Sequence, residues 1–148
     1  MNAFSNIPAH SVMPMGDMGL EEIRRAAFRA EQICLVADLA KSKTKTEILE
    51  TIGKEMSFGE HFGKNFDALY DCLTDLKPQK SDGDPGFVLV LQNLPHSVKF
   101  DDEDRQALLD VFRDASEHFF DQEIAFRVFY TVDAKAVETA KTGSKKTT

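Results

Sequence analysis

Three aspartates between residues 66 and 76 are the side chains of this sequence best placed to do chemistry. Asp67, Asp71 and Asp75 recur every four residues, which places them on one face if the segment is helical. Stacked carboxylates of this kind can act as acids, bases or metal ligands in hydrolysis, or they can bind a cationic partner. A solvated polar face that uses aspartate by chance is the third interpretation of the same pattern.

The segment around these aspartates is predicted to be a short helix in which the acids do little for folding. Asn65 stands at the N-cap position, where its side-chain oxygen can accept a free amide of the first turn. The predicted buried face contains Phe66, Leu69, Leu73 and Leu76. Like charges four residues apart cost a few tenths of a kcal/mol, and only Asp67 gains from the helix dipole. A stretch that accepts this cost is a candidate for function.

Composition and charge limit what the chain can bind. The 148 residues, 42% of them hydrophobic, suffice for one domain with one core. The net charge is −7, and residues 58–124 alone hold fifteen acidic and six basic side chains. This acidic middle repels phosphates, which argues against nucleic acid as a direct ligand. It favours a basic protein partner, whose encounter rate the opposite charge would raise.

The two cysteines and the hydropathy pattern indicate a cytoplasmic protein. Cys34 and Cys72 are too few for a disulfide framework and lack zinc-site spacing, so we expect buried thiols in a reducing compartment. Residues 1–19 contain no apolar core of a signal peptide, and no apolar run approaches the length needed to cross a bilayer. We expect no metal and no cofactor.

The remaining elements alternate between strand and helix. Apolar runs predict strands at residues 32–39, 87–91 and 124–132. Helices are predicted over 19–30, from the capping box Thr44–Glu47 to about Met56, and from the acids at 101–104 to about Phe120. This alternation predicts an α/β fold with a small three-stranded parallel sheet packed with helices. We expect a flexible segment over 1–18, a domain over 19–132 whose residues 19–31 form an N-terminal helical extension, and a flexible tail over 133–148.

The loop and helix that carry the aspartates resemble the signature of the barstar family, small intracellular inhibitors of barnase-type ribonucleases. The resemblance rests on Phe62-Gly63, Asn65 and the run DALYDCLT from Asp67 to Thr74. A second stretch that resembles the family is LDVFRDA, residues 109–115. It extends from about residue 32 to 132. The family has a three-stranded parallel sheet backed by helices, which is the layout that the predicted elements give.

The resemblance implies that an acidic helix and the preceding loop block a ribonuclease active site, with carboxylates in the place of substrate phosphate. The residues that it assigns to the partner contact are His61, Gly63, Asn65, Asp67, Tyr70, Asp71, Thr74 and Asp114. Asp71 would be the central anchor and Asp67 the second carboxylate, while Asp114 matches a family glutamate. Tyr70 stands where the best-known member has tryptophan, and His61 where it has tyrosine, which bears on which ribonuclease is recognised.

Two other functions fit parts of the pattern. The first is an interaction or immunity module of the same fold for a different basic protein or toxin nuclease, because a fold does not fix its partner. The second is a hydrolase that uses Asp67, Asp71 and Asp114 with His61. No glycine-rich phosphate loop or Ser/His/Asp pattern accompanies these acids, so we expect no enzyme. We assign no role to His10, His96 or His118, and we expect the free protein to be a monomer because acidic surfaces repel each other.

Overall fold

Strands and helices alternate along the described chain, except that two helices follow each other between the second and third strands. The structure is a computed structural model, and it describes residues 4–59, 65–78 and 85–133. The elements in order are β1 (His10–Pro14), α1 (Leu20–Arg29), β2 (Ile33–Asp38), α2 (Lys45–Glu55), α3 (Phe66–Thr74), β3 (Gly86–Leu94), α4 (Asp102–Asp121) and β4 (Ala125–Val132). This alternation gives the α/β class that the sequence predicts.

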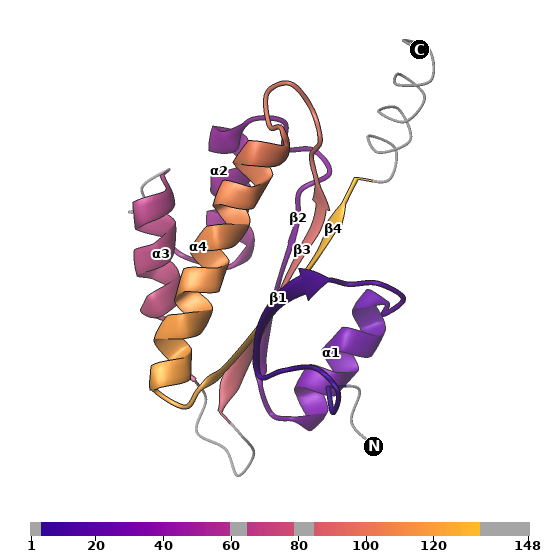
Figure 1. Cartoon of the computed structure of the whole chain (residues 1–148), viewed down its shortest axis with the longest axis vertical. Helices are drawn as coiled ribbons and strands as arrows, with labels where there is room; N and C mark the ends of the chain where they lie inside the picture. Colours follow the sequence, from indigo (N-terminus) through magenta and orange to yellow (C-terminus); the bar gives the residue numbers. More distant parts are fainter. Residues whose placement is uncertain (1–3, 60–64, 79–84, 134–148) are drawn as a thin grey trace.

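The sheet has four parallel strands in the order β1-β4-β3-β2 (Figure 1). β3 and β4 lie in its centre, and β1 and β2 form its edges. The run Phe87–Leu91 of β3 is completely buried, as expected for a strand covered on both faces. The predicted parallel pairing is therefore confirmed.

The predicted number of three strands is wrong, because β1 adds a fourth. Its residues His10–Pro14 pair with Phe126–Tyr130 of β4. The prediction rested on apolar runs, whereas β1 (HSVMP) mixes apolar residues with histidine, serine and proline and lies half-exposed at the edge. Backbone hydrogen bonds to β4 hold such an edge strand in the sheet, and a hydropathy pattern contains no information about these bonds. Residues 10–14 of the segment that we expected to be flexible are thus part of the sheet.

Helices cover both faces of the sheet, so the fold has three layers. Figure 1 shows α2, α3 and α4 on one face and α1 on the other. Alternate residues of β3 face opposite ways: Phe87 and Leu89 join the larger core under α2–α4, while Val88 and Val90 join a second core with Ile23 of α1. The helical extension predicted over residues 19–31 is α1, which forms one layer of the sandwich.

Local capping fixes where three of the helices begin. Thr44 and Glu47 form the predicted capping box of α2, and Asp101 and Asp104 form a second one at α4. Asn65 caps α3 as predicted. None of the helices within the described ranges is both long and apolar enough to cross a membrane. Residues 134–148 of the predicted tail lie outside those ranges.

Candidate functional site

α3 presents its aspartates to solvent and its leucines to the core. Asp67, Asp71 and Asp75 are exposed, while Leu69 and Leu73 are completely buried. The helix is therefore anchored on one side by apolar packing and displays three carboxylates on another. This is the arrangement that the helical spacing of the sequence predicts.

The other residues assigned to the site on α3 and its preceding loop have defined local roles. The Asn65 side-chain oxygen accepts a hydrogen bond from the backbone amide of Ala68 at 2.7 Å. The side-chain nitrogen of Asn65 (Nδ2) is therefore the group that this residue can offer to a partner. The Thr74 hydroxyl donates to the Tyr70 carbonyl at 2.9 Å. His61 and Gly63 lie outside the described residues, so their predicted roles stay predictions.

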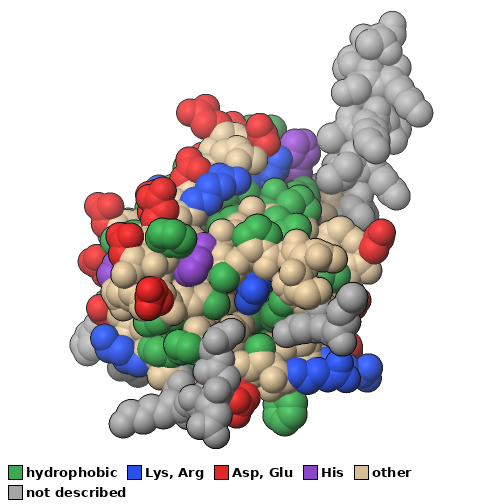
Figure 2. Space-filling model, turned by 60° about the horizontal axis from the view of Figure 1, so that its bottom comes forward, with side chains coloured by type: hydrophobic (Ala, Val, Ile, Leu, Met, Phe, Trp, Pro, Cys, Tyr) green, Lys and Arg blue, Asp and Glu red, His purple; other side chains and the backbone are tan. Residues whose placement is uncertain are grey.

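A groove runs between α3 and α4, which pack against each other. It encloses about 660 Å³, and Tyr70 lies half-buried in its lining. The carboxylates that line it come from both helices: Asp67, Asp71, Asp114, Glu117 and Asp121. Figure 2 shows acidic side chains gathered on the left of the molecule, the side on which Figure 1 places α3 and α4. The packing thus brings Asp114 into one surface with Asp67 and Asp71, as the resemblance implies.

Besides the apolar Phe66 and Val111, three groove residues were not assigned to the site from the sequence. Glu117, His118 and Asp121 follow Asp114 at helical spacing on α4 and line the same groove. His118 lies with its Nε2 atom 2.8 Å from Gln122 Nε2 and its ring edge-on to Phe119. The signal that could have found them is the spacing of three, four and seven residues from Asp114. His118 received no role from the sequence because the α3 residues that share its groove come together with it only in the fold.

The carboxylates of the groove are available to a partner. Within residues 4–59, 65–78 and 85–133, neither Asp67, Asp71 nor Asp114 forms an ion pair. The arginines of α4 are paired elsewhere, Arg105 with Asp102 at 2.6 Å and Arg113 with Asp110 at 2.7 Å. Lys45 lies near α3, but its Nζ atom is 4.2 Å from the centroid of the Phe66 ring. The surface therefore presents negative charge that the described chain does not neutralise.

Both thiols have a pKa that the protein raises above the ordinary value of cysteine. Cys72 lies on α3, and burial raises its pKa, as do the nearby carboxylates of Asp75 and Asp71. Burial also raises the pKa of Cys34, and Arg24 partly offsets this. Both thiols are half-buried rather than fully buried as predicted. A raised pKa keeps each thiol neutral at physiological pH, which disfavours a role as nucleophile.

The geometry suits binding better than hydrolysis. Asp67 and Asp71 follow one another along an exposed helix face and share an open groove with Asp114, whereas a hydrolytic site needs groups that converge on one reacting atom in a cleft that excludes water. Among the described residues, no set of three or more histidine, cysteine, aspartate or glutamate side chains is placed to hold a metal ion. A row of carboxylates on a rigid helix can instead meet a row of cationic groups on another protein.

A comparison with known protein families covers this site. The model of the family described as Barstar (barnase inhibitor) matches residues 32–131, about two thirds of the chain. The match begins just before β2 and ends near the end of β4, so it contains α3, α4 and the acidic groove between them. β1 and α1 precede the matched residues.

Proposed function

The chain belongs to the barstar family, and on this premise we propose that it inhibits a basic ribonuclease of barnase type by binding it one to one. In this proposal α3 and the preceding loop enter the active-site cleft and exclude RNA. The observation that carries it is the placement of Asp67 and Asp71 on an exposed helix face beside Asp114, without ion pairs in the described part of the chain.

The chemistry of such a complex follows from the charges of the two partners. A ribonuclease of this class holds arginine, lysine and histidine side chains that bind phosphate and repel one another in the free enzyme. Carboxylates relieve that repulsion through charge-assisted hydrogen bonds. α3 is already ordered by its Asn65 cap and its buried leucines, so little conformational entropy is lost when it binds.

We assign the contacts by position on the groove. Asp71 is the central anchor, and Asp67 lies one turn earlier on the same face. Asp114 adds a carboxylate from α4, and Tyr70 presents a half-buried ring between the two helices. Thr74 lies at the end of α3, where its hydroxyl is bonded to its own helix. Asn65 offers its amide nitrogen from the loop.

The proposal also includes the oligomeric state of the protein and its location in the cell. We propose an inhibitor rather than an enzyme, a monomer when free because its acidic surface repels a second copy, and a cytoplasmic location because its thiols suit a reducing compartment. A different basic nuclease is the second candidate partner. The observation that favours it is the presence of Tyr70 and Asp114 in place of the family's tryptophan and glutamate.

The decisive experiment is a titration of a barnase-type ribonuclease with the protein while RNA cleavage is followed. We expect the wild type to abolish cleavage at equimolar ratio. The Asp71→Ala variant should bind at least about thirtyfold more weakly, because removing one partner of a buried charge pair costs about 2 to 5 kcal/mol. The matched control is Asp17→Ala, which removes an exposed aspartate from the connection between β1 and α1.

The outcomes separate a binding role from a structural one. Asp17→Ala should inhibit like the wild type, and Asp71→Ala should keep the thermal stability of the wild type. Full inhibition by Asp71→Ala would remove the central contact of the proposal. Unfolding of Asp71→Ala would show that the carboxylate serves the fold instead of the partner.

A further inference from the structure

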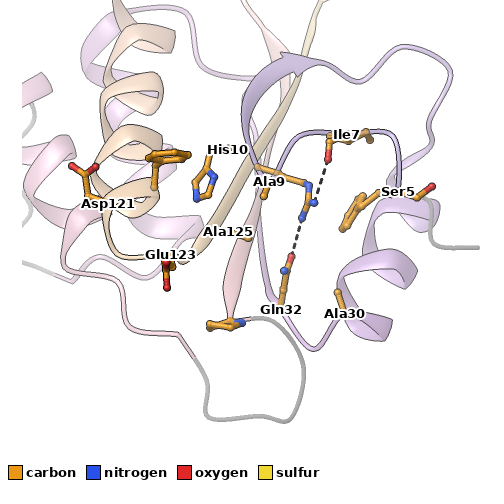
Figure 3. A pocket seen from close by; sticks show the side chains of 13 residues that line it. Ser5, Ile7, Ala9, His10, Ala30, Gln32, Asp121, Glu123 and Ala125 are labelled. Atoms are coloured by element: carbon orange, nitrogen blue, oxygen red, sulfur yellow. Dashed lines mark hydrogen bonds between the residues drawn. The ribbon is translucent and has the colours of Figure 1, made fainter.

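Phe120 is an unusually exposed aromatic residue near the end of α4. The exposed fraction of Phe120 is 63%, and the next residue, Asp121, lines the acidic groove. Phe120 and Asp121 also line a second cavity of about 850 Å³ at the amino ends of the strands (Figure 3). Asp121 therefore lies where the groove and this cavity meet, which makes the surface around Phe120 continuous with the proposed binding site.

The residue that orients Phe120 comes from β1, which lies outside the family match. The ring of His10 stands edge-on to the Phe120 ring, with the ring centroids 5.1 Å apart and an interplanar angle of 78°. The Nε2 atom of His10 lies 2.7 Å from the Ile124 carbonyl oxygen, and this hydrogen bond fixes the imidazole. β1 thus holds one side of Phe120 while most of its ring stays open to solvent.

Carboxylates lie near Phe120 on α4 and in the turn that follows this helix. Glu117, Phe120 and Asp121 lie at positions i, i+3 and i+4 of α4 and share one face of the helix. Glu123, which also lines the cavity, follows two residues after Asp121 (Figure 3). An aromatic face flanked by carboxylates matches a guanidinium group, because arginine stacks on rings and donates in a planar fork to carboxylates. A lysine ammonium lacks both the plane and the fork.

The arginines of this chain near Phe120 are engaged with other groups. Arg113, which lines a further cavity together with Glu117 and Phe120, pairs with Asp110 at 2.7 Å. The guanidinium of Arg127 lies 4.8 Å from the centroid of the Phe4 ring. Arg127 also donates to Ile7 and Gln32, as the dashed lines of Figure 3 mark. Within the described residues these two arginines thus contact other groups, and the open face of Phe120 can accept a guanidinium from a partner.

We propose that the partner ribonuclease places an arginine side chain on Phe120, with its guanidinium hydrogen-bonded to Glu117 and Asp121. This inference rests on the proposed function and extends its surface from the groove to the end of α4. β1 contributes through His10, so the N-terminal strand takes part in partner selection although it precedes the matched residues. The arginine contact selects among basic partners that all satisfy Asp71.

The test measures the dissociation constant of the complex with a barnase-type ribonuclease for variants of Phe120. Phe120→Ala should weaken binding about tenfold, because both the stacking of the cation on the aromatic ring and the apolar contact are lost. Phe120→Leu should weaken it almost as much, since leucine keeps apolar area but has no ring face. The matched control is Phe28→Ala on α1, where the exposed fraction is 84% and the helix covers the opposite face of the sheet.

A double-mutant cycle identifies the guanidinium. Glu117→Gln alone should weaken binding several-fold, and in the Phe120→Ala background its effect should shrink, because both side chains hold the same group. His10→Ala should weaken binding several-fold by releasing the Phe120 ring. Urea unfolding of each variant measures its free energy of unfolding, so a loss of affinity caused by a less stable fold is distinguished from the loss of a contact with the partner.

The outcomes distinguish this inference from the proposed function. Wild-type affinity of Phe120→Ala, together with loss of binding in Asp71→Ala, would overturn the arginine contact and leave the inhibitor function standing. Wild-type affinity of Phe120→Leu would show an ordinary apolar contact and overturn the arginine assignment. If Asp71→Ala also binds normally, both proposals fail.

Discussion

Two acidic stretches of this chain contain the same residue types in different surroundings. One is the start of α4, residues 101–104 (DDED), and the other is the face of α3 that carries Asp67, Asp71 and Asp75. Both raise the negative charge of the region by several units. In the first stretch most of the carboxylates have partners within the chain, whereas in the described residues none of the three aspartates of the second stretch forms an ion pair.

At the start of α4, three of the four acids (Asp101, Asp102 and Asp104) have partners within the chain. Asp101 accepts a hydrogen bond from the Asp104 amide at 3.0 Å, and Asp104 accepts one from the Asp101 amide at 3.2 Å. Asp102 pairs with Arg105 at 2.6 Å. The positive end of the helix dipole also favours negative charge here. These carboxylates stabilise the fold.

On α3 the corresponding support is missing. Only Asp67 lies in the first turn, where the dipole helps, and in the described part of the chain neither Asp71 nor Asp75 forms an ion pair. Like charges one turn apart cost about 0.2 to 0.5 kcal/mol. The two stretches therefore differ in whether the described chain supplies a partner for the carboxylates, and not in the density of acids in the sequence.

The largest expected effect comes from removing two charges from each stretch and comparing the binding of a barnase-type ribonuclease. Asp67→Asn with Asp71→Asn should weaken the complex about a thousandfold or more, since each lost charge pair costs about 2 kcal/mol or more. Asp102→Asn with Glu103→Gln makes the same change of net charge at the other stretch. It should alter affinity only a few-fold, through long-range attraction alone.

Association rates at two salt concentrations test the same contrast. The association rate of the wild type should fall steeply between about 0.05 and 0.5 M NaCl, because salt screens exposed charges. The Asp67/Asp71 variant should lose most of this salt dependence, while the Asp102/Glu103 variant should keep it. Equal losses of affinity in both variants would mean that net charge, rather than the α3 surface, drives binding.

Stability should respond in the opposite sense, with a smaller effect. Asp101→Ala removes the N-cap of α4 and should lower the free energy of unfolding by about 1 kcal/mol. Asp71→Ala relieves repulsion and should leave that free energy unchanged or raise it by a few tenths of a kcal/mol. Urea unfolding followed by circular dichroism measures both. A loss of stability in Asp71→Ala equal to that in Asp101→Ala would erase the distinction between the two stretches.

Local signals in the sequence predict much of the fold, because helix caps and buried faces are determined by residues close together in the chain. The capping box of Thr44 and Glu47, the Asn65 cap and the buried leucines of α3 all depend on residues within a few positions of one another. The apolar run of β3 predicts a central strand for the same reason. The exposure of Asp67 and Asp71 follows from helical spacing alone.

Features made by tertiary packing are not predictable in this way. β1 is held at the sheet edge by backbone pairing with β4. The side-chain pattern of β1 does not predict this pairing. His118 joins Asp67 because α3 packs on α4, and His10 meets Phe120 across more than a hundred residues of sequence. Each of these neighbours comes from another element. A spacing rule within one segment cannot find them.

The smallest expected effect concerns the two thiols, which extend the comparison from the acids to their neighbours. Because burial and the carboxylates of Asp75 and Asp71 raise the pKa of Cys72, its thiolate should form only above the ordinary pH range of a thiol. The rate of alkylation by iodoacetamide as a function of pH reports this pKa. Asp71→Asn should move the Cys72 profile to lower pH, but only partly, since burial is the larger cause.

Cys34 supplies the internal control, because its charged neighbour has the opposite sign. Arg24 lowers the pKa that burial raises, so Arg24→Gln should move the Cys34 profile to higher pH and leave Cys72 unchanged. The charge changes at Asp71 and Arg24 thus shift two profiles in opposite directions within one protein. If Asp71→Asn leaves the Cys72 profile where it was, the carboxylate does not act on the thiol, and the negative potential that we assign to the α3 surface is weaker than its row of aspartates indicates.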